Sequence, residues 1–247
     1  MNQITLTGMV LSAAPMGEYD RRVVLLTKER GKIAAFARGA RKPNSALVGV
    51  TSPFTFGTFE VYEGRTSYTL VSASVSNYFE ELRMDVEGAY YGFYFLDIAN
   101  YYGREANDET ALLKLLYQTL RALVNPHIPN KLIRYIYELK AVSVNGEGPQ
   151  VFSCVCCGDK ERKKVFSVKR GGLLCENCAG RAKDGKELLP STLYAMQYIA
   201  AMPVEKLYTF VVKEEVLKEL GEVVGAYMEE YVGRKFKSLE ILGTVAE

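Results

Sequence analysis

The spacing of apolar residues divides the chain into a part typical of strands and a part typical of helices. From Gln3 to Ser76 apolar residues alternate with polar ones or form short runs, which is the pattern of strands that bury one face. Glu63-Gly-Arg65 marks a tight hairpin connection, and a short helix fits near Ser45–Gly49 in the connector before it. The predicted strands span residues 4–11, 22–27, 32–38, 54–62 and 66–72. This order is typical of a five-stranded OB-type barrel.

From about Asn77 the apolar residues recur at helical spacing instead. The first helical stretch is apolar on every side and dense in aromatic residues, which predicts a central core helix. Three predicted helices span residues 80–102, 129–144 and 213–231. Two more run from a cap at Asp108 to a stop at Pro126, and from about residue 190 to a break at Pro203.

All five cysteines lie between residues 154 and 178, and four of them form the pairs Cys154-x-x-Cys157 and Cys175-x-x-Cys178. Each pair can place two sulfurs about 2.3 Å from one ion, so the spacing predicts a four-thiolate zinc site. A closed ligand set leaves no position for a substrate, which indicates a structural ion. The alternatives are two disulfides, typical of a secreted chain, or a redox pair, which needs a thioredoxin-like strand and helix that the pattern lacks.

Cys156 leaves the ligand choice open, because Cys154 with Cys156, or Cys156 with Cys157, could also bind the ion. The x-x spacing favours Cys154 and Cys157. Cys156 is then expected to be a small packed side chain, with a reactive thiol as the alternative.

The predicted fold class is α+β. An OB-fold barrel over residues 1–78 is followed by an all-helical domain over residues 79–247, with a four-cysteine zinc knuckle inserted at about residues 151–180. The boundary is placed where the apolar spacing changes.

Composition narrows the class of protein without naming a function. The chain has 247 residues, 48% of them hydrophobic and 24% charged, so it can bury a core and is long enough for two domains. A net charge of +2 excludes a generally basic nucleic-acid coat but allows a local basic face. No apolar run reaches about 18 residues and the N-terminus lacks a signal-peptide pattern, so we expect a cytoplasmic protein. Clustered cysteines agree with a reducing compartment.

A series of short motifs follows the order found in a known family. In the barrel they combine glycines with a Gly-Glu-x-Asp turn and a basic Gly-Ala-Arg-Lys segment. After the barrel they include a Tyr-Phe junction and the entry to the first cysteine pair. They lie at Gly8–Val10, Gly17–Asp20, Val23–Thr27, Gly31–Lys32, Gly39–Lys42, Ser45, Tyr78–Phe79, Leu82, Asp85 and Leu139–Gly148. From about Gln3 to Cys178 the chain resembles the bacterial RecO family of recombination mediators and DNA repair proteins. It departs from the usual pattern at Cys156 and in the less polar stretch Ala13–Gly17.

The resemblance implies a protein without catalytic activity that binds single- and double-stranded DNA and anneals complementary strands. The implied partners are RecR and the C-terminal tail of single-strand binding protein, with functional links to RecF and to RecA, which is loaded onto DNA coated by single-strand binding protein. No membrane is implied, and the location is the cytoplasm, in association with the nucleoid. The implied cofactor is one structural Zn²⁺ held by Cys154, Cys157, Cys175 and Cys178.

A protein that binds any DNA sequence needs cations for phosphates and aromatic faces for bases. OB barrels commonly bind along strands two and three and the adjoining loops. Arg38, Arg41 and Lys42 are preferred because they bracket a glycine on one loop. Phe36 is expected in the core, with stacking on a base as the alternative. The alternative for any of these cations is a solvated side chain. The candidate DNA-binding residues are Arg21, Arg22, Lys32, Arg38, Arg41 and Lys42, with Lys28 and Arg30 on the turn between the strands.

Two further groups have more than one interpretation. The basic residues from Arg162 to Lys183 either balance the charge of the zinc thiolates or extend the DNA path. Part of the aromatic helix could instead line a groove for the tail of single-strand binding protein, with Arg121, Lys131 or Arg134 receiving its acidic end. His127, the only histidine, is expected to be exposed and without a role.

Two other functions compete with the mediator. A zinc-dependent nucleic-acid hydrolase is disfavoured by the closed ligand set, the single histidine and the lack of a P-loop motif or a nucleophile with a base. A zinc-ribbon RNA-binding or transcription-associated module shares the same ingredients, and selective RNA binding would favour it.

Overall fold

The computed structural model describes residues 2–65, 67–161 and 164–245. Within these residues the chain forms two compact units. The first holds a β-barrel, the helices that follow it and the last helix of the chain. The second holds the middle helices and the cysteine loop. The domain boundary predicted after residue 78 remains a prediction.

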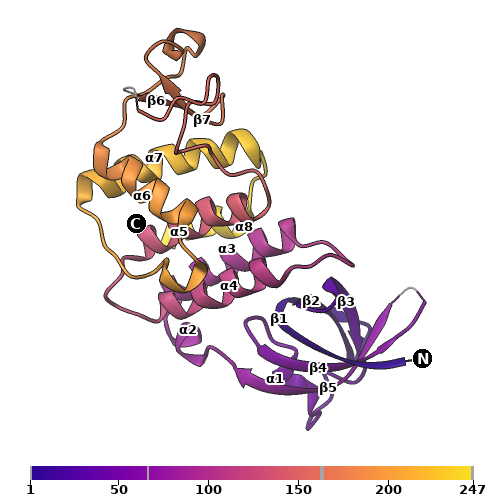
Figure 1. The fold of residues 1–247 in the computed structure, drawn as a ribbon. Coiled ribbons are helices and arrows are strands. Elements are labelled where there is room, and N and C mark those ends of the chain that lie inside the picture. The colour runs from indigo at the N-terminus through magenta and orange to yellow at the C-terminus, as the bar shows by residue number, and fades with distance from the viewer. Residues whose placement is uncertain (1, 66, 162–163, 246–247) are drawn as a thin grey trace. The chain divides into compact units, whose positions relative to one another are not determined.

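The first unit begins with a closed barrel (Figure 1). Its strands are β1 (Asn2–Met16), β2 (Asp20–Thr27), β3 (Gly31–Ala37), β4 (Phe56–Glu63) and β5 (Tyr68–Asn77), in the order β1-β2-β3-β5-β4. The predicted short helix is α1 (Leu47–Val50), in the connector between β3 and β4. The predicted OB-fold is therefore confirmed. Thr66, predicted as the first residue of the last strand, lies outside the described residues.

The barrel closes because its first strand is long enough to pair on both sides. β1 pairs with β2 from Gly8 to Met16 and with β4 from Asn2 to Met9. A shift of register between Val10 and Ser12 bends β1 where it passes from one partner to the other. The interior is filled by alternate side chains, including Ile33, Ala35 and Ala37 of β3.

Helices α2 (Glu80–Met84), α3 (Val86–Tyr102) and α4 (Thr110–Leu123) follow the barrel in the first unit. The single helix predicted over residues 80–102 is wrong in one respect, because it breaks at Asp85, whose ψ of 107° is extended. α3 packs against α4 and β1 and buries most of its residues, including Tyr91 and Tyr94. The prediction of a central core helix is therefore confirmed for α3.

The last helix, α8 (Lys237–Val245), was not predicted. A helix of nine residues is marginal by itself, so its stability must come from packing. Phe236, directly before it, packs edge-on against Tyr94 and Tyr101 of α3, with ring centroids 5.7 and 6.0 Å apart. Ser238 Oγ donates a hydrogen bond to Asp97 Oδ2 at 2.6 Å. Contacts far apart in the chain thus stabilise α8.

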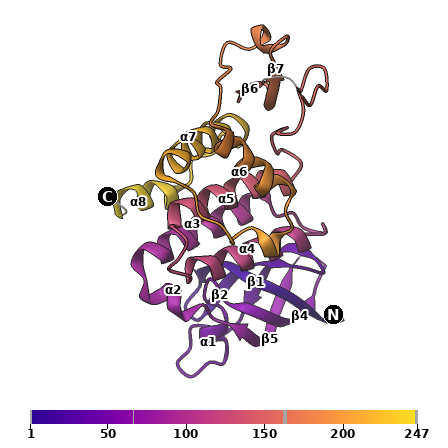
Figure 2. The same ribbon diagram turned by 60° about the vertical axis from the view of Figure 1, so that its left-hand side comes forward.

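The second unit contains α5 (Asn130–Val144), α6 (Pro190–Ala201) and α7 (Glu214–Tyr231), close to the predicted ranges. Between α5 and α6 the chain forms a hairpin of β6 (Lys164–Ser167) and β7 (Gly172–Cys175) and the single turn η1 (Ala179–Arg181), and η2 (Val204–Lys206) precedes α7. Figures 1 and 2 both show the hairpin at one end of this unit, beyond α7. None of the described helices has the length and apolarity needed to cross a bilayer.

A buried lysine closes the C-terminal end of α6. Lys140 of α5 is 8% exposed, and its ammonium donates to the carbonyl oxygens of Ile199, Ala200 and Met202 at 3.1, 2.9 and 2.8 Å. Carbonyls in the last turn of a helix have no partner inside it, and the cation meets the negative end of the helix dipole. Burial lowers the pKa of Lys140, but the three carbonyls satisfy its ammonium. This contact ties α5 to α6.

Candidate metal centre and nucleic-acid interface

The structure brings the four predicted metal ligands together. The Sγ atoms of Cys154, Cys157, Cys175 and Cys178 all lie within 4.8 Å of one another, and those of Cys157 and Cys175 are 3.6 Å apart. In a tetrahedral site with Zn–S bonds of about 2.3 Å, the sulfurs are about 3.8 Å apart. The donor set and its spacing therefore fit one thiophilic divalent ion.

Two turns present these sulfurs. In the first, Gly158 adopts a φ of +76°, which only glycine tolerates easily, and its N–H donates to the carbonyl of Cys154 at 2.9 Å. In the second, Cys175 ends β7, and the N–H of Cys178 donates to the carbonyl of Cys175 at 2.8 Å. Gly171, at a φ of +70°, lies in the turn that joins β6 to β7. The hairpin thereby returns the second pair to the first.

Backbone hydrogen bonds hold the hairpin on both sides of the loop. Before the first pair, Gln150 donates its N–H to the carbonyl of Gly171 and accepts from the N–H of Leu173, each at 2.9 Å. After the second pair, Phe166 and Lys186 exchange two hydrogen bonds of 2.7 and 2.8 Å. The entry and the exit of the loop are therefore attached to the hairpin that carries Cys175.

The thiols cannot all ionise without a cation. Burial disfavours the Cys154 thiolate, but backbone hydrogen bonds, the largest from Cys175, outweigh it and lower the pKa of Cys154 to about 6. Hydrogen bonding to the Cys175 side chain and burial raise the pKa of Cys178 to about 12. The first thiolate of the cluster forms readily, whereas the last thiol must ionise against the negative charge of the thiolates already formed. A divalent ion that binds all four thiolates removes this conflict and releases protons.

Cys156 is not among the four clustered sulfurs. Its side chain is partly buried and packs against the group formed by Cys154, Leu174, Cys175 and Cys178. This position agrees with the expected small packed side chain.

The basic residues around the cysteine loop have different surroundings. Arg162 and Lys163 lie outside the described residues. The ammonium of Lys164 donates to the carbonyl of Lys160. The carboxylate of Asp184 lies close to some of these basic residues. It accepts hydrogen bonds from Ser167 Oγ at 2.8 Å and from the N–H of Lys169 at 3.0 Å. Lys169, Arg170, Arg181 and Lys183 are exposed.

The candidate DNA-binding residues lie at two ends of the barrel. The register of β2 and β3 places Arg21 opposite Ala37 at one end and Thr27 opposite Gly31 at the other. The first end, here called the rim, is formed by residues 17–19 between β1 and β2, by Asp20 at the start of β2 and by residues 38–45 after β3. The second, here called the opposite end, carries the turn at residues 28–30 and the connection between β4 and β5. Arg38, Arg41 and Lys42 belong to the rim, and all three are exposed.

Hydrogen bonds join the two segments of the rim. Asp20 Oδ1 accepts from the N–H of Gly39 at 2.7 Å. Arg41 donates its N–H to the carbonyl of Tyr19 at 2.8 Å and its guanidinium to the carbonyl of Gly17 at 3.1 Å. Within the described part of the chain, no carboxylate forms an ion pair with the three rim cations. Their charges therefore remain available on a backbone of defined shape.

The other three candidates differ from these. Arg21 donates to the carbonyl of Val48 at 3.0 Å and to Thr51 Oγ1 at 2.7 Å, so it fixes the end of α1. Arg22 is exposed on the outer face of β2. Lys32 lies at the opposite end, partly buried, and donates to the carbonyl of Asn100 in α3. Their assignment as DNA ligands remains a prediction.

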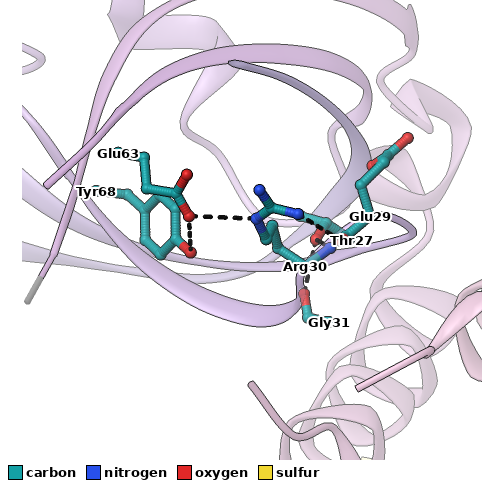
Figure 3. Close-up of polar contacts among 6 residues, drawn as sticks. All are labelled: Thr27, Glu29, Arg30, Gly31, Glu63 and Tyr68. Carbon is teal, nitrogen blue, oxygen red and sulfur yellow. Dashed lines mark hydrogen bonds and ion pairs between the residues drawn. The ribbon is translucent and has the colours of Figure 1, made fainter. Parts of the chain in front are cut away.

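At the opposite end a cation of the turn between β2 and β3 is neutralised by a carboxylate at the end of β4. Arg30 Nε lies 3.2 Å from Glu63 Oε1, which also accepts a 3.2 Å hydrogen bond from the hydroxyl of Tyr68. Figure 3 shows the side chains of Arg30 and Tyr68 both pointing toward the Glu63 carboxylate. The N–H of Arg30 donates to Thr27 Oγ1 at 3.2 Å, and this hydroxyl donates to the carbonyl of Gly31 at 2.8 Å. The hydrogen bond from Arg30 holds the pKa of the Glu63 carboxyl below its usual value. Arg30 therefore stabilises the turn at residues 28–30, and Glu63 balances its charge.

Phe36 does not join the barrel core, so that prediction is wrong. It lies between Ala35 and Ala37, which face the interior, and its own side chain is only partly buried on the outer face. Its register partner on β2 is Arg22. The alternation along β3 points Ala35 and Ala37 inward and Phe36 outward, because small alanines rather than the phenylalanine fill the narrow interior.

Tyr19 is a rim residue that the sequence did not single out. Its side chain is 45% exposed, and the ammonium of Lys42 lies 5.5 Å from the centroid of its ring. The available signal was an aromatic residue inside the polar turn Gly17–Asp20, directly before two arginines.

Residues proposed for other roles lie in the second unit or near its start. His127 is exposed, as predicted. Lys131 is exposed, and Arg134 forms a 2.7 Å ion pair with Glu138 one helical turn away. Arg121 is also exposed. The reception of an acidic peptide end by any of them remains a prediction.

Comparison with known proteins places the chain in a family. Residues 1–79 match the family described as Recombination protein O N terminal, and residues 83–240 match Recombination protein O C terminal. The chain is 32% identical over 247 residues to "DNA repair protein RecO" of Acetivibrio thermocellus, covering 99% of this chain and 98% of that protein. It is also 32% identical to the proteins of the same name from Bacillus pumilus, over 95% of this chain and 91% of the relative, and from Alkaliphilus metalliredigens, over 95% and 96%. The chain therefore belongs to the RecO family of DNA repair proteins.

Proposed function

We propose that this protein is a non-enzymatic recombination mediator, which binds single- and double-stranded DNA, anneals complementary strands and helps load RecA onto DNA coated by single-strand binding protein. Membership of the RecO family supports a role in DNA repair. The proposed partners are RecR and the C-terminal tail of single-strand binding protein, with links to RecA and RecF. The proposed location is the cytoplasm, in association with the nucleoid.

The observation that carries this proposal is the rim. Arg38, Arg41 and Lys42 lie exposed on a turn that hydrogen bonds define, at one end of an OB-fold barrel. OB-folds bind oligonucleotides along strands two and three and the loops beside them. Cations contact phosphates irrespective of base sequence, which suits a protein that must bind any strand.

The cysteine loop is proposed to hold one structural Zn²⁺ through Cys154, Cys157, Cys175 and Cys178. The ion would replace apolar core in a hairpin that has only two short strands. The four sulfurs fill a tetrahedral set, so the site supplies shape to the second unit and takes no part in a reaction.

An annealing assay tests the proposal. Complementary strands coated with the cognate single-strand binding protein should anneal faster when this protein is added, without ATP, and RecR should co-purify with it. The charge-reversed variant Arg38→Glu/Arg41→Glu/Lys42→Glu should lose this activity. Selective binding of RNA over DNA, with no annealing, would instead support the zinc-ribbon RNA-binding module.

A further inference from the structure

The rim carries an aromatic ring among its cations. Tyr19 lies in the turn between β1 and β2, and 45% of its side chain is exposed. Isolated exposed tyrosines are ordinary on protein surfaces. This one is distinguished by its setting, because its own carbonyl accepts the N–H of Arg41 and its neighbour Asp20 accepts the N–H of Gly39. The backbone that carries the ring is thus tied to the segment that carries Arg38, Arg41 and Lys42.

Lys42 places a positive charge close to that ring. Its ammonium lies 5.5 Å from the ring centroid, within the range of a cation–π contact. The side chain of Lys42 is also exposed, so the ammonium can meet a phosphate while it stays near the ring. A cation that can contact a phosphate therefore lies over one face of the ring, on a backbone that hydrogen bonds between two segments hold in place.

We propose that Tyr19 is a base-stacking platform, and that it makes the rim selective for unpaired nucleotides. This inference rests on the proposed DNA-binding function and names the form of DNA that the rim prefers. In a duplex each base is covered by its neighbours on both faces, so the rim cations can contact the phosphates but the ring has no free base to stack on. In a single strand a base can leave its neighbours and lie on the ring, while Arg41 and Lys42 take the adjoining phosphates.

The outer face of the barrel offers a continuation of the same arrangement. Phe36 is partly exposed on β3, and its register partner Arg22 is exposed on β2. A strand that leaves the rim along β2 and β3 would meet a second aromatic side chain beside a second cation. The pairing of ring and cation is repeated, which suits a strand of alternating bases and phosphates.

The test measures binding of the full-length, zinc-loaded protein to a fluorescent oligothymidine and to a hairpin duplex by anisotropy, at several salt concentrations. Tyr19→Ala should weaken single-strand binding about 5- to 100-fold, the range expected for one stacked base, and should leave duplex binding and both salt slopes unchanged. Tyr19→Phe should bind like the unchanged protein, because the ring is retained. Tyr62→Ala, at a tyrosine of β4 that is 38% exposed, is the matched control and should have no effect.

The outcomes separate this inference from the proposed function. Unchanged single-strand binding by Tyr19→Ala, or an equal loss on duplex and single strand, overturns the platform. An equal loss in Tyr19→Phe overturns it as well, because the hydroxyl rather than the ring would then be at work. If Arg38→Glu/Arg41→Glu/Lys42→Glu retains its DNA affinity, the rim itself is not the DNA-binding surface. The melting temperature of each variant checks that the barrel is intact.

Discussion

The two ends of the barrel carry similar residues in different electrostatic settings. At the opposite end Arg30 is paired with Glu63 and Lys32 donates to a carbonyl of α3. At the rim Arg38, Arg41 and Lys42 are exposed, and the described residues include no ion-pair partner for them. A cation already held by a carboxylate must give up that ion pair to bind a phosphate, whereas the rim cations have, in the part of the chain that the structure describes, no ion pair to give up. Charge in the sequence is therefore a weaker guide to binding than the partner that each charge has.

The largest expected effect is the loss of the proposed zinc ion and of the hairpin in the second unit. The same variant tests whether DNA binding at the rim depends on that unit. Cys175→Ser removes one of four clustered sulfurs, so the protein should lose its zinc and the hairpin of β6 and β7 should unfold. Zinc content by mass spectrometry and amide exchange of residues 164–175 measure this. Cys156→Ser is the matched control and should keep one zinc per chain, because Cys156 lies outside the cluster.

DNA affinity of Cys175→Ser completes that experiment. The rim is built from barrel residues alone, so single-strand affinity should change by less than about 3-fold, a small part of what several lost phosphate contacts would remove. A loss of binding with an intact hairpin would contradict the assignment of the zinc to a purely structural role.

Next in size is charge reversal at the rim. Arg38→Glu/Arg41→Glu/Lys42→Glu should lower single-strand affinity by roughly 50-fold or more near 0.15 M salt, and should reduce the slope of log affinity against log salt by about 2. The matched control is Arg30→Gln, at the cation of the opposite end that is paired with Glu63, which should change affinity little. An equal loss of single-strand affinity per charge at both ends would contradict the claim that the rim cations bind DNA and the paired cation at the opposite end does not.

At the opposite end, the ion pair between Arg30 and Glu63 should make the stability of the protein depend on pH, and its loss should leave DNA affinity unchanged. The pKa of Glu63 is lowered in the fold by its hydrogen bond to Arg30, so its stabilising contribution is present above its usual pKa of 4.5 and is lost as the pH falls through the lowered value. Urea midpoints of the unchanged protein should exceed those of Glu63→Gln at pH 6, and the difference should shrink as the pH falls below 4.5. DNA affinity at pH 7 should be the same for both. A difference that grows in acid would contradict the pairing.

The smallest effects distinguish two neighbouring arginines of β2. Arg21→Ala should lower the free energy of unfolding by about 1 kcal/mol, because two hydrogen bonds to the end of α1 are lost. Arg22→Ala should leave stability unchanged and weaken single-strand binding by roughly 3-fold, the share of one phosphate contact. Thermal melting and anisotropy measure the pair, and the reverse pattern would show that the two roles are exchanged.

Much of the fold could be predicted from local pattern. The spacing of residue types along the chain predicts the strands, the helices α4 to α7 and the two Cys-x-x-Cys pairs. The predictions fell short at the break between α2 and α3 and at the last helix, and for the last helix distant residues decide. α3 is separated from α2 at Asp85, and α8 is stabilised by Tyr94 and Asp97, which lie more than a hundred residues earlier in the chain.

The sequence by itself determined the OB-fold, the clustered cysteines and the presence of cations beside β2 and β3, because each depends on residue type at short range. Only the tertiary structure decided which cations have partners and which aromatic side chains face outward. Lys32 meets α3 and Arg21 meets α1, while Phe36 faces outward and Tyr19 lies beside Lys42. These outcomes depend on which segments the closed barrel and its loops bring side by side, and the order of residues along one strand does not contain that information.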